Sequence, residues 1–345
     1  MANKLITIKE LSEQTLQSLS VSSENWTGFL RSAARLYKYP FHEQILIHAQ
    51  RPDATACASF DLWNNRMKRY VNKGATGIAL LDDSGQRPYL RYVFDVSDTN
   101  SRESTPFHLW EMREDDQAVV LEELSNHFGA EKGFDDLPFQ FQLHGIVSNA
   151  IADNITDYAN ILFEQREGSN FEELDENDIV AELSQALVYS VGYICMTRTV
   201  EDANAFYSEL SIEYPISRFN TPQMVSCLGQ AVSDISEMVL RQIERTVREN
   251  QRVEPEKFAQ SKVIGETIEK SIERGEQDEQ LSIHAGGRLS DSQPDFESAA
   301  GSRDRQIWED AQKLLAGAET GDLQPHATDG DASPAPVGDR PDDET

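Results

Sequence analysis

The 345-residue chain is poor in cysteine and lacks long apolar runs. Its three cysteines, Cys57, Cys195 and Cys227, are too few and too scattered for a disulfide framework, and none forms a CxxC pair typical of structural zinc. No stretch approaches the roughly eighteen apolar residues that a membrane helix needs. The first residues, MANKLITIKE, have no apolar signal-peptide core. The sequence therefore predicts a cytoplasmic protein without a membrane segment.

The motifs of several common enzyme classes are also missing. The sequence has no GxxxxGK[ST] phosphate loop, no GxGxxG turn, no GxSxG elbow and no HExxH zinc helix. His42 and Glu43 begin the last pattern, but the next histidine is His48, and ligands six residues apart lie on different faces of a helix. We therefore expect no catalytic residue, no metal ligand and no cofactor.

Positively charged residues are few, and they are distributed unevenly along the chain. The chain has 31 Lys and Arg against 60 Asp and Glu, a formal charge of -29 at pH 7. As a whole it should be repelled by nucleic acid, because Lys and Arg make the phosphate contacts. Residues 1–110 hold 13 basic and 11 acidic residues, whereas residues 111–250 hold 8 and 27, and residues 251–345 hold 10 and 22. The first 110 residues therefore contribute none of the acidic excess.

A basic island with interleaved aromatic residues lies between Gly28 and Lys73, where eight basic residues accompany three acidic ones. Cations that follow a phosphate backbone, alternating with rings on which bases stack, are typical of a single-strand binder. The same composition also fits a solvated basic face over an aromatic core. The candidate DNA-binding residues are Arg31, Arg35, Lys38, Tyr39, Arg51, Trp63, Lys68, Arg69, Tyr70, Lys73 and Gly74, with Tyr39, Trp63 or Tyr70 as the stacking rings.

Residues 1–110 predict an α+β domain in which helices precede a small antiparallel sheet. Ser22 or Ser23 can cap a helix with Trp26 on its apolar stripe, and Pro40 suits the first turn of the next helix. A strand at ATACASF, helical turns at DLWNNRM and extended pieces at RYV, GIALL and PYLRYVFDVSDT follow. Phe60 is expected in the core.

Residues 111–250 predict an all-α helical domain, and residues 251–345 a disordered polar and acidic tail. Gly129 should stop the first helix of this domain, and Pro222 should open the last one. The tail is too poor in branched apolar and aromatic residues to offset the entropy of ordering, apart from one helical pattern at Asp304–Leu315. Apolar residues of the last helix recur at the spacing of bundle packing, at Val225, Leu228, Val232, Ile235, Val239 and Ile243.

The order of residues between about 20 and 100 resembles the amino-terminal domain of ArdC-type antirestriction proteins. The similar run begins WTGFLRSAARLYKYPFHEQILIHAQ, continues through DLWNNRMKRYVNKGATGIALL and ends at YVFDVSDT. The resemblance implies a domain that binds single-stranded DNA, in proteins of plasmids, phages and integrative elements. The positions carried over with it are Tyr39, Gln50, Trp63, Lys73, Gly74, Gly77, Phe94 and Asp95.

The rest of the chain resembles the leading portion of very large conjugative-element proteins that continue into helicase-like and DNA-methylase-like domains. The chain departs from both patterns. The HExxH of the peptidase that often follows the ArdC-type domain is missing, and no helicase or methylase motif appears before Thr345. The resemblance therefore implies a non-catalytic module whose partners are single-stranded DNA, helicase-like or methylase-like domains or conjugation proteins, and no membrane.

Three hypotheses follow from the sequence. The first is a single-stranded DNA-binding module of a mobile genetic element. The second gives the function to residues 111–250, whose 27 carboxylates could mimic DNA or bind another protein and so inhibit a restriction enzyme. The third is a degenerate peptidase with His144 and Glu182 as remnants, although the ligand spacing is absent. Inhibition of restriction by residues 111–250 alone would favour the second hypothesis.

Overall fold

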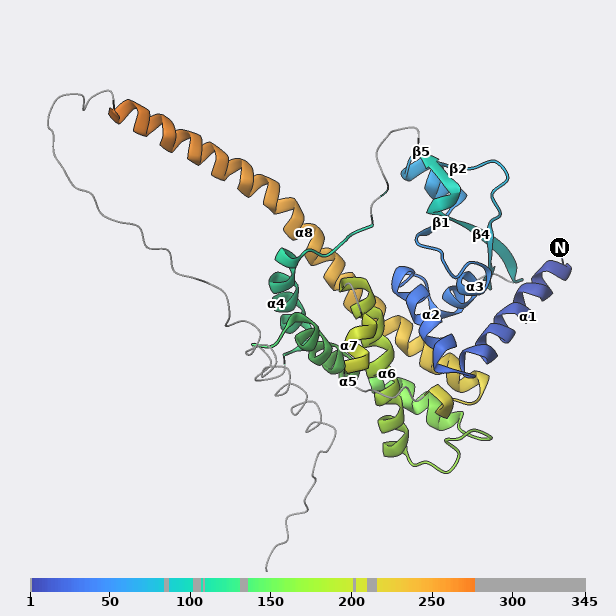
Figure 1. The fold of residues 1–345 in the computed structure, drawn as a ribbon. Helices are drawn as coiled ribbons and strands as arrows, with labels where there is room; N and C mark the ends of the chain where they lie inside the picture. The colour runs from blue at the N-terminus through green and yellow to red at the C-terminus, as the bar shows by residue number, and fades with distance from the viewer. Residues whose placement is uncertain are drawn as a thin grey trace, which may run out of the picture. The chain divides into compact units, whose positions relative to one another are not determined.

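The computed structural model shows an α/β amino-terminal region followed by a helical region (Figure 1). All described residues belong to one compact unit, Met1–Ser292. The structure describes residues 2–83, 87–101, 107, 109–130, 136–200, 203–209 and 216–276, with side chains described from residue 4 to residue 252.

Three helices open the chain, and the sequence signals at Ser22 and Pro40 predict the second and the third. The side chain of Ser22 accepts a hydrogen bond from the backbone N of Asn25, which confirms it as the N-cap of the second helix. Trp26 and Phe29 of that helix are fully buried. Pro40 precedes the third helix and fixes its entry angle. The helices are α1 (Ala2–Leu19), α2 (Ser23–Arg35) and α3 (Phe41–Gln50).

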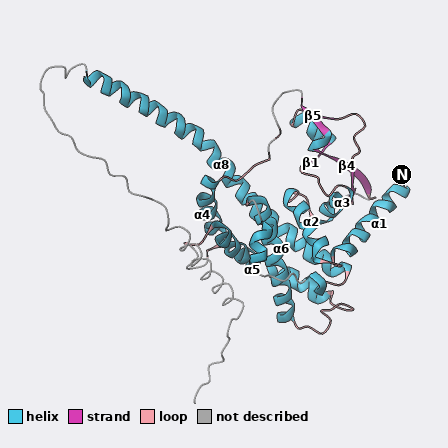
Figure 2. Cartoon of the chain, viewed as in Figure 1, coloured by secondary structure: helices cyan, strands magenta, loops and turns pink. Residues whose placement is uncertain are grey.

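Two small antiparallel sheets follow the helices (Figure 2). The first has the strand order β1-β4-β3, with β4 in the centre, and the second pairs β2 with β5. A π-helical turn, η1 (Leu62–Arg66), connects β1 to β2, and a 3-10 turn, η2 (Val96–Asp98), connects β4 to β5. The strands are β1 (Cys57–Ser59), β2 (Arg69–Val71), β3 (Ile78–Asp82), β4 (Tyr89–Asp95) and β5 (Thr99–Ser101).

An apolar core joins the three-stranded sheet to α1 and α3. Ile47 of α3 and Leu80 of β3 are both fully buried in it, and Ile8 of α1 covers its edge. Val93 contributes from the central strand and faces Ile78 across the β3–β4 ladder. Burial of this kind fixes the register of β4, because a one-residue slip would turn Val93 away from the core.

The helical region begins with a 3-10 turn, η3 (Glu114–Asp116). Gly129 ends the next helix with a positive φ of 80°, as expected of a residue without Cβ. The predicted seam of the last helix is confirmed, since all six of its apolar residues are at most 2% exposed. The elements are α4 (Gln117–Phe128), α5 (Phe139–Glu164), α6 (Glu176–Thr199), α7 (Ala203–Glu209), η4 (Ile216–Arg218) and α8 (Pro222–Glu276).

Two features of the helical region differ from the sequence interpretation. The backbone of α8 continues to Glu276, through the first part of the segment 251–345 that we predicted as a disordered tail. The short helix α7 was not predicted, because seven residues are too few for a periodic pattern. Residues 277–345, including the helical pattern at Asp304–Leu315, lie outside the described residues.

The amino-terminal helices pack directly on the helical region. The indole Nε1 of Trp26 donates a hydrogen bond of 3.0 Å to Oγ of Ser190 in α6. A Cβ atom on Gly229 of α8 would lie 2.0 Å from the ring of Phe41 in α3, so only glycine allows this close approach. The ranges 1–110 and 111–250, which we expected as separate domains, therefore share buried contacts.

One helix of the described residues, α6 (Glu176–Thr199), is long and apolar enough to cross a membrane. Within the protein, however, 61% of its most apolar window is buried. A core helix of a soluble protein has the same properties.

Candidate nucleic-acid interface

Four of the predicted DNA-binding cations have partners within the protein. Arg31 donates to the hydroxyl of Tyr193 at 3.0 Å, and Arg35 donates to the backbone oxygen of Ala54 at 2.8 Å. Lys38 pairs with Glu244 at 2.6 Å, and Arg51 pairs with Asp98. These contacts join α2 and α3 to the loops and helices around them. A phosphate would have to compete with them, which makes these four cations weak candidates.

Tyr39 and Trp63 are structural rather than exposed stacking rings. Trp63 is only 1% exposed, and its Nε1 donates a hydrogen bond of 2.8 Å to the backbone oxygen of Phe94. The hydroxyl of Tyr39 donates to the backbone oxygen of Cys57 at 2.8 Å, and burial raises the pKa of this hydroxyl. Trp63 is buried and Tyr39 is partly buried with its hydroxyl bonded, so both are weaker candidates for base stacking than Tyr70.

The remaining predicted residues lie close together in the sequence in and around β2, at positions 68–74, and Arg66, which was not among the predicted site residues, lies just before them. Arg66, Lys68 and Lys73 are exposed, and within the described part of the chain none of them contacts an acidic side chain. Gly74 has a positive φ of 90° in the turn that follows β2. We call Arg66, Lys68 and Lys73 the basic edge.

Arg69 and Tyr70 complete this segment. Arg69 lies in β2 and is half-buried, because its guanidinium donates to Oγ1 of Thr99 at 2.7 Å and lies 5.9 Å from the ring centre of Phe107. Tyr70 alternates with it on the strand and is 36% exposed. The β2–β5 ladder, in which Tyr70 faces Asn100, fixes both orientations.

The backbone of this segment is unusual at two neighbouring points. Residues Leu62–Arg66 form a π-helical turn, a rare conformation that is frequent at functional sites. Lys68 has a φ of 51° and is the one non-glycine residue with a positive φ in the part of the chain that the structure describes. A left-handed conformation costs a lysine roughly 1–2 kcal/mol. Strain held at an exposed cation points to a functional constraint.

Exposed rings lie on one face of the three-stranded sheet. Ala58 faces Phe94 in the β1–β4 ladder, and Phe60 follows directly after β1, which ends at Ser59. The two rings meet edge to face at 6.4 Å. Phe60 is 54% exposed, Phe94 is half-buried, and Tyr92 on the same face is 38% exposed. We call Phe60, Tyr92 and Phe94 the aromatic face.

Sequence reasoning missed Phe60 and Tyr92 as candidates. Phe60 was expected in the core, and this prediction is wrong because β1 ends at Ser59 and the sheet face beyond it is open. The alternation of Tyr92 and Phe94 along β4 was the available signal. Gly77 supports the arrangement, since a Cβ there would lie 3.1 Å from the Phe94 ring.

Gln50 and Asp95, two positions carried over from the family resemblance, hold the sheet to the helices. Gln50 both donates to the backbone oxygen of Ala79 at 2.8 Å and accepts from its backbone N at 2.9 Å. Asp95 accepts hydrogen bonds from the backbone N of Thr55 and of Ala56. Burial raises the pKa of Asp95, but its hydrogen bonds outweigh burial and lower the pKa below its ordinary value. Both residues are therefore structural.

A buried polar network fixes the amino-terminal region against α8. Its centre is Glu244, which accepts hydrogen bonds from the hydroxyl of Tyr37 and the ammonium of Lys38. Trp110 donates to the same Tyr37 hydroxyl at 3.0 Å, and Arg198 lies over the Trp110 ring at 3.9 Å. Burial raises the pKa of Glu244, but the hydrogen bonds from Lys38 and Tyr37 lower it overall.

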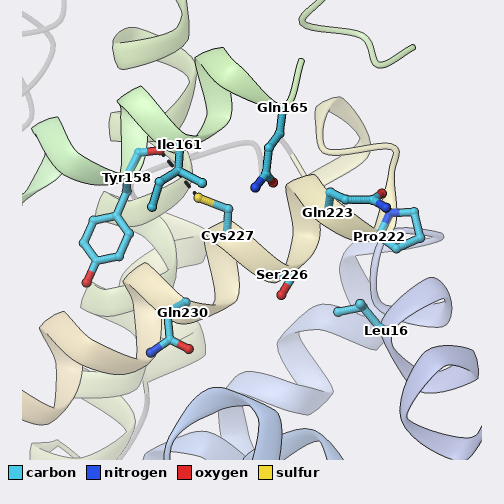
Figure 3. A pocket seen from close by; sticks show the side chains of 9 residues that line it. All are labelled: Leu16, Tyr158, Ile161, Gln165, Pro222, Gln223, Ser226, Cys227 and Gln230. Carbon is cyan, nitrogen blue, oxygen red and sulfur yellow. Dashed lines mark hydrogen bonds between the residues drawn. The ribbon is translucent and has the colours of Figure 1, made fainter. Parts of the chain in front are cut away.

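A shallow cavity of about 490 Å³ lies between α1, α5 and α8 (Figure 3). Amide groups of Gln165, Gln223 and Gln230 line it, together with apolar side chains such as Leu16. Neither Lys nor Arg is among its lining residues, which all belong to α1, α5 and α8 or follow α5 directly. The cavity therefore lacks a cation for phosphate and contains no part of the basic edge.

The structure does not bring His144 and Glu182 together. Glu182 pairs with Arg218 at 2.7 Å. His144 is buried beside Gly192, which lies ten residues, or about 15 Å of helix, from Glu182. Burial lowers the pKa of His144 to about 4. Among the described residues no group of three or more His, Cys, Asp or Glu could hold a metal ion.

Comparisons with family models, curated proteins and solved structures found no match to this chain.

Proposed function

We propose that this protein binds single-stranded DNA through the basic edge and the aromatic face, and that this chain is not catalytic. The observation that carries the proposal is the exposure of Lys68 and Lys73 without acidic partners among the described residues, close in sequence to an exposed Tyr70. The rest of the protein carries a large negative charge. A cationic surface in such a protein would select for an anion.

The two surfaces would have different tasks. The side chains of the basic edge neutralise phosphates and release counterions, so affinity falls as salt rises. Phe60 offers a ring face on which an unpaired base stacks, and such stacking contributes about 1–3 kcal/mol per base. Tyr92 stands on the same sheet, with the ammonium of Lys4 4.9 Å from its ring centre. In a duplex the base faces are already covered by their neighbours. The aromatic face therefore favours single strands over duplex DNA.

The resemblance of residues 20–100 to ArdC-type domains supplies the biological setting of the proposal. It suggests a cytoplasmic protein of a mobile genetic element, in the context of conjugation or antirestriction. Helicase-like or methylase-like domains or conjugation proteins are the further partners that this setting suggests.

Fluorescence anisotropy with the full chain tests the proposal. A labelled oligonucleotide of about 20 nucleotides should bind more tightly than a duplex of the same length, and Phe60→Ala should weaken binding about tenfold. Ile161→Ala is the matched control, because Ile161 is a 41% exposed apolar residue of α5 away from both surfaces. Equal affinity for single strand and duplex, or an unchanged affinity in Phe60→Ala, would contradict the proposed role of the aromatic face.

A further inference from the structure

Two aliphatic side chains stand exposed at the π-helical turn between β1 and β2. Leu62 is 37% exposed and Met67 is 46% exposed. The backbone N of Met67 donates to the backbone oxygen of Leu62 at 3.1 Å, which brings the two positions together. The aromatic face begins two residues before Leu62, at Phe60. We call Leu62 and Met67 the apolar tip.

The apolar tip is held on a rigid base. Between its two residues lies the buried Trp63, which is hydrogen-bonded to Phe94 and packs edge to face against the ring of Phe107 at 5.5 Å. The backbone N of Leu62 also donates to Oγ of Ser59 at 3.3 Å. These contacts hold the turn in one conformation. A ligand that binds Leu62 and Met67 therefore loses no affinity to ordering of this part of the chain.

Charge indicates the kind of ligand that covers the tip. Arg66 and Lys68 flank Met67, and both are exposed without an acidic partner among the described residues. Asp61 is the single acidic residue between Phe60 and Lys73. An apolar surface rimmed by free cations is complementary to a nucleic acid, whose base faces are apolar and whose backbone is anionic.

We propose that Leu62 and Met67 form a wedge that packs against the last base pair where single-stranded DNA meets a duplex, an inference that rests on the proposed function. Aliphatic side chains inserted between base pairs of an intact duplex must break stacking, which costs a few kcal/mol per step. At a junction the outer side of the terminal pair is covered only by the flexible single-stranded arm, which the wedge displaces more easily. The wedge covers that side while the single strand continues onto the aromatic face.

The wedge predicts a preference among DNA forms. The full chain should bind a fork, made of a duplex with a single-stranded arm of about 10 nucleotides, about tenfold more tightly than the arm alone. A 2-aminopurine in the terminal base pair should brighten on binding, because the wedge separates it from the stacked single strand. A blunt duplex should bind more weakly than either.

The decisive variant is the double substitution Leu62→Ser and Met67→Ser, with the single substitution Met67→Gln as a milder form. Both positions are exposed, so folding should be retained, as circular dichroism would verify. The double variant should lose the fork preference and the 2-aminopurine signal while keeping its single-strand affinity within about twofold. Val21→Ser, at a 77% exposed apolar position between α1 and α2, should change neither.

The outcomes separate the two proposals. Equal binding of fork and single strand by the unmodified protein would overturn the wedge and leave single-strand binding standing. A fork preference that survives the double substitution would also overturn the wedge, and would leave the apolar tip to a protein partner. Absence of binding to every DNA form would overturn both proposals.

Discussion

Trp63 donates its indole hydrogen to the backbone oxygen of Phe94 at 2.8 Å, and this bond ties the π-helical turn to the central strand of the sheet. The turn carries the apolar tip and leads into the basic edge, whereas Phe94 belongs to the aromatic face. One hydrogen bond thus connects the elements that we propose to contact DNA. Its removal should affect stability more than binding, since Trp63 itself is buried.

Trp63→Phe should lower the free energy of unfolding by about 2–4 kcal/mol, because a partly buried carbonyl loses its donor and the smaller ring leaves a cavity. Urea unfolding followed by circular dichroism measures this change. Single-strand affinity should stay within about twofold. A loss of affinity at unchanged stability would instead indicate that Trp63 stacks on a base.

Two substitutions of Lys68 separate the effect of its backbone strain on stability from the effect of its charge on DNA binding. Lys68→Gly should raise the free energy of unfolding by about 0.5–1 kcal/mol, because glycine adopts a positive φ without penalty. Lys68→Ala should bring no such gain, since alanine keeps the penalty. Both variants should lose one phosphate contact, which lowers the slope of log affinity against log salt by about 0.7.

Chemical unfolding and salt titrations of the two variants provide the comparison. If Lys68→Gly bound DNA as tightly as the unmodified protein, the strained cation would have no part in the proposed site. If Lys68→Ala gained as much stability as Lys68→Gly, the left-handed conformation would not be the source of the strain.

Two glycines test the packing of α3 on α8. Gly229→Ala should destabilise the protein by about 1–3 kcal/mol, because the added Cβ would lie 2.0 Å from the Phe41 ring and the buried helices would have to move apart. Gly28→Ala is the control, since nothing lies within 4 Å of its Cβ position. In the interior of α2 this substitution should stabilise by about 0.5–1 kcal/mol. Equal effects at both positions would contradict the close approach.

His144 predicts a pH dependence of stability. The folded protein keeps His144 neutral down to about pH 4, whereas the unfolded chain binds a proton near the ordinary pKa of 6.5. The contribution of neutral His144 to the free energy of unfolding is therefore fully present above pH 6.5. It decreases as the pH falls from 6.5 towards 4, by up to about 3 kcal/mol.

His144→Phe should remove this part of the pH dependence. The variant keeps a ring beside Phe206 and removes Nδ1, a buried atom with no hydrogen-bond partner among the described residues. Free energies of unfolding measured at several values between pH 4 and pH 7 test the prediction. A pH profile identical to that of the unmodified protein would show that another group causes the loss.

The sequence predicted the helices and strands well where local signals were strong. Ser22, Pro40 and Gly129 mark helix ends through capping and backbone restriction, which act within a few residues. The seam of α8 followed from its apolar spacing. The length of α8 beyond residue 250 was not predicted, because the segment was interpreted from its polar composition, although Ile264, Ile268 and Ile272 recur every four residues there.

The candidate site was predicted only in part. Residue types and charge pointed to the segment that we propose as the site, but they placed Phe60 in the core and Trp63 on the surface. The sequence cannot show that the chain leaves β1 through a π-helical turn, and this turn carries Trp63 into the interior and leaves Phe60 on an open sheet face. Likewise, the sequence cannot show that Lys38 is paired and Lys68 is not. The partner of Lys38 is Glu244, which lies about 200 residues further along the chain.

The most direct test of the account is the salt dependence of single-strand binding. It is measured for the unmodified full chain and for the double variant that carries both Lys68→Ser and Lys73→Ser. The unmodified protein should bind a labelled oligonucleotide of about 20 nucleotides with an affinity that falls steeply between about 50 and 200 mM salt, and the variant should show a slope smaller by about 1.4. Lys9→Ser, at an exposed position of α1, should leave the slope unchanged. No salt-sensitive binding at low ionic strength, or the same slope in all three proteins, would contradict the central claim.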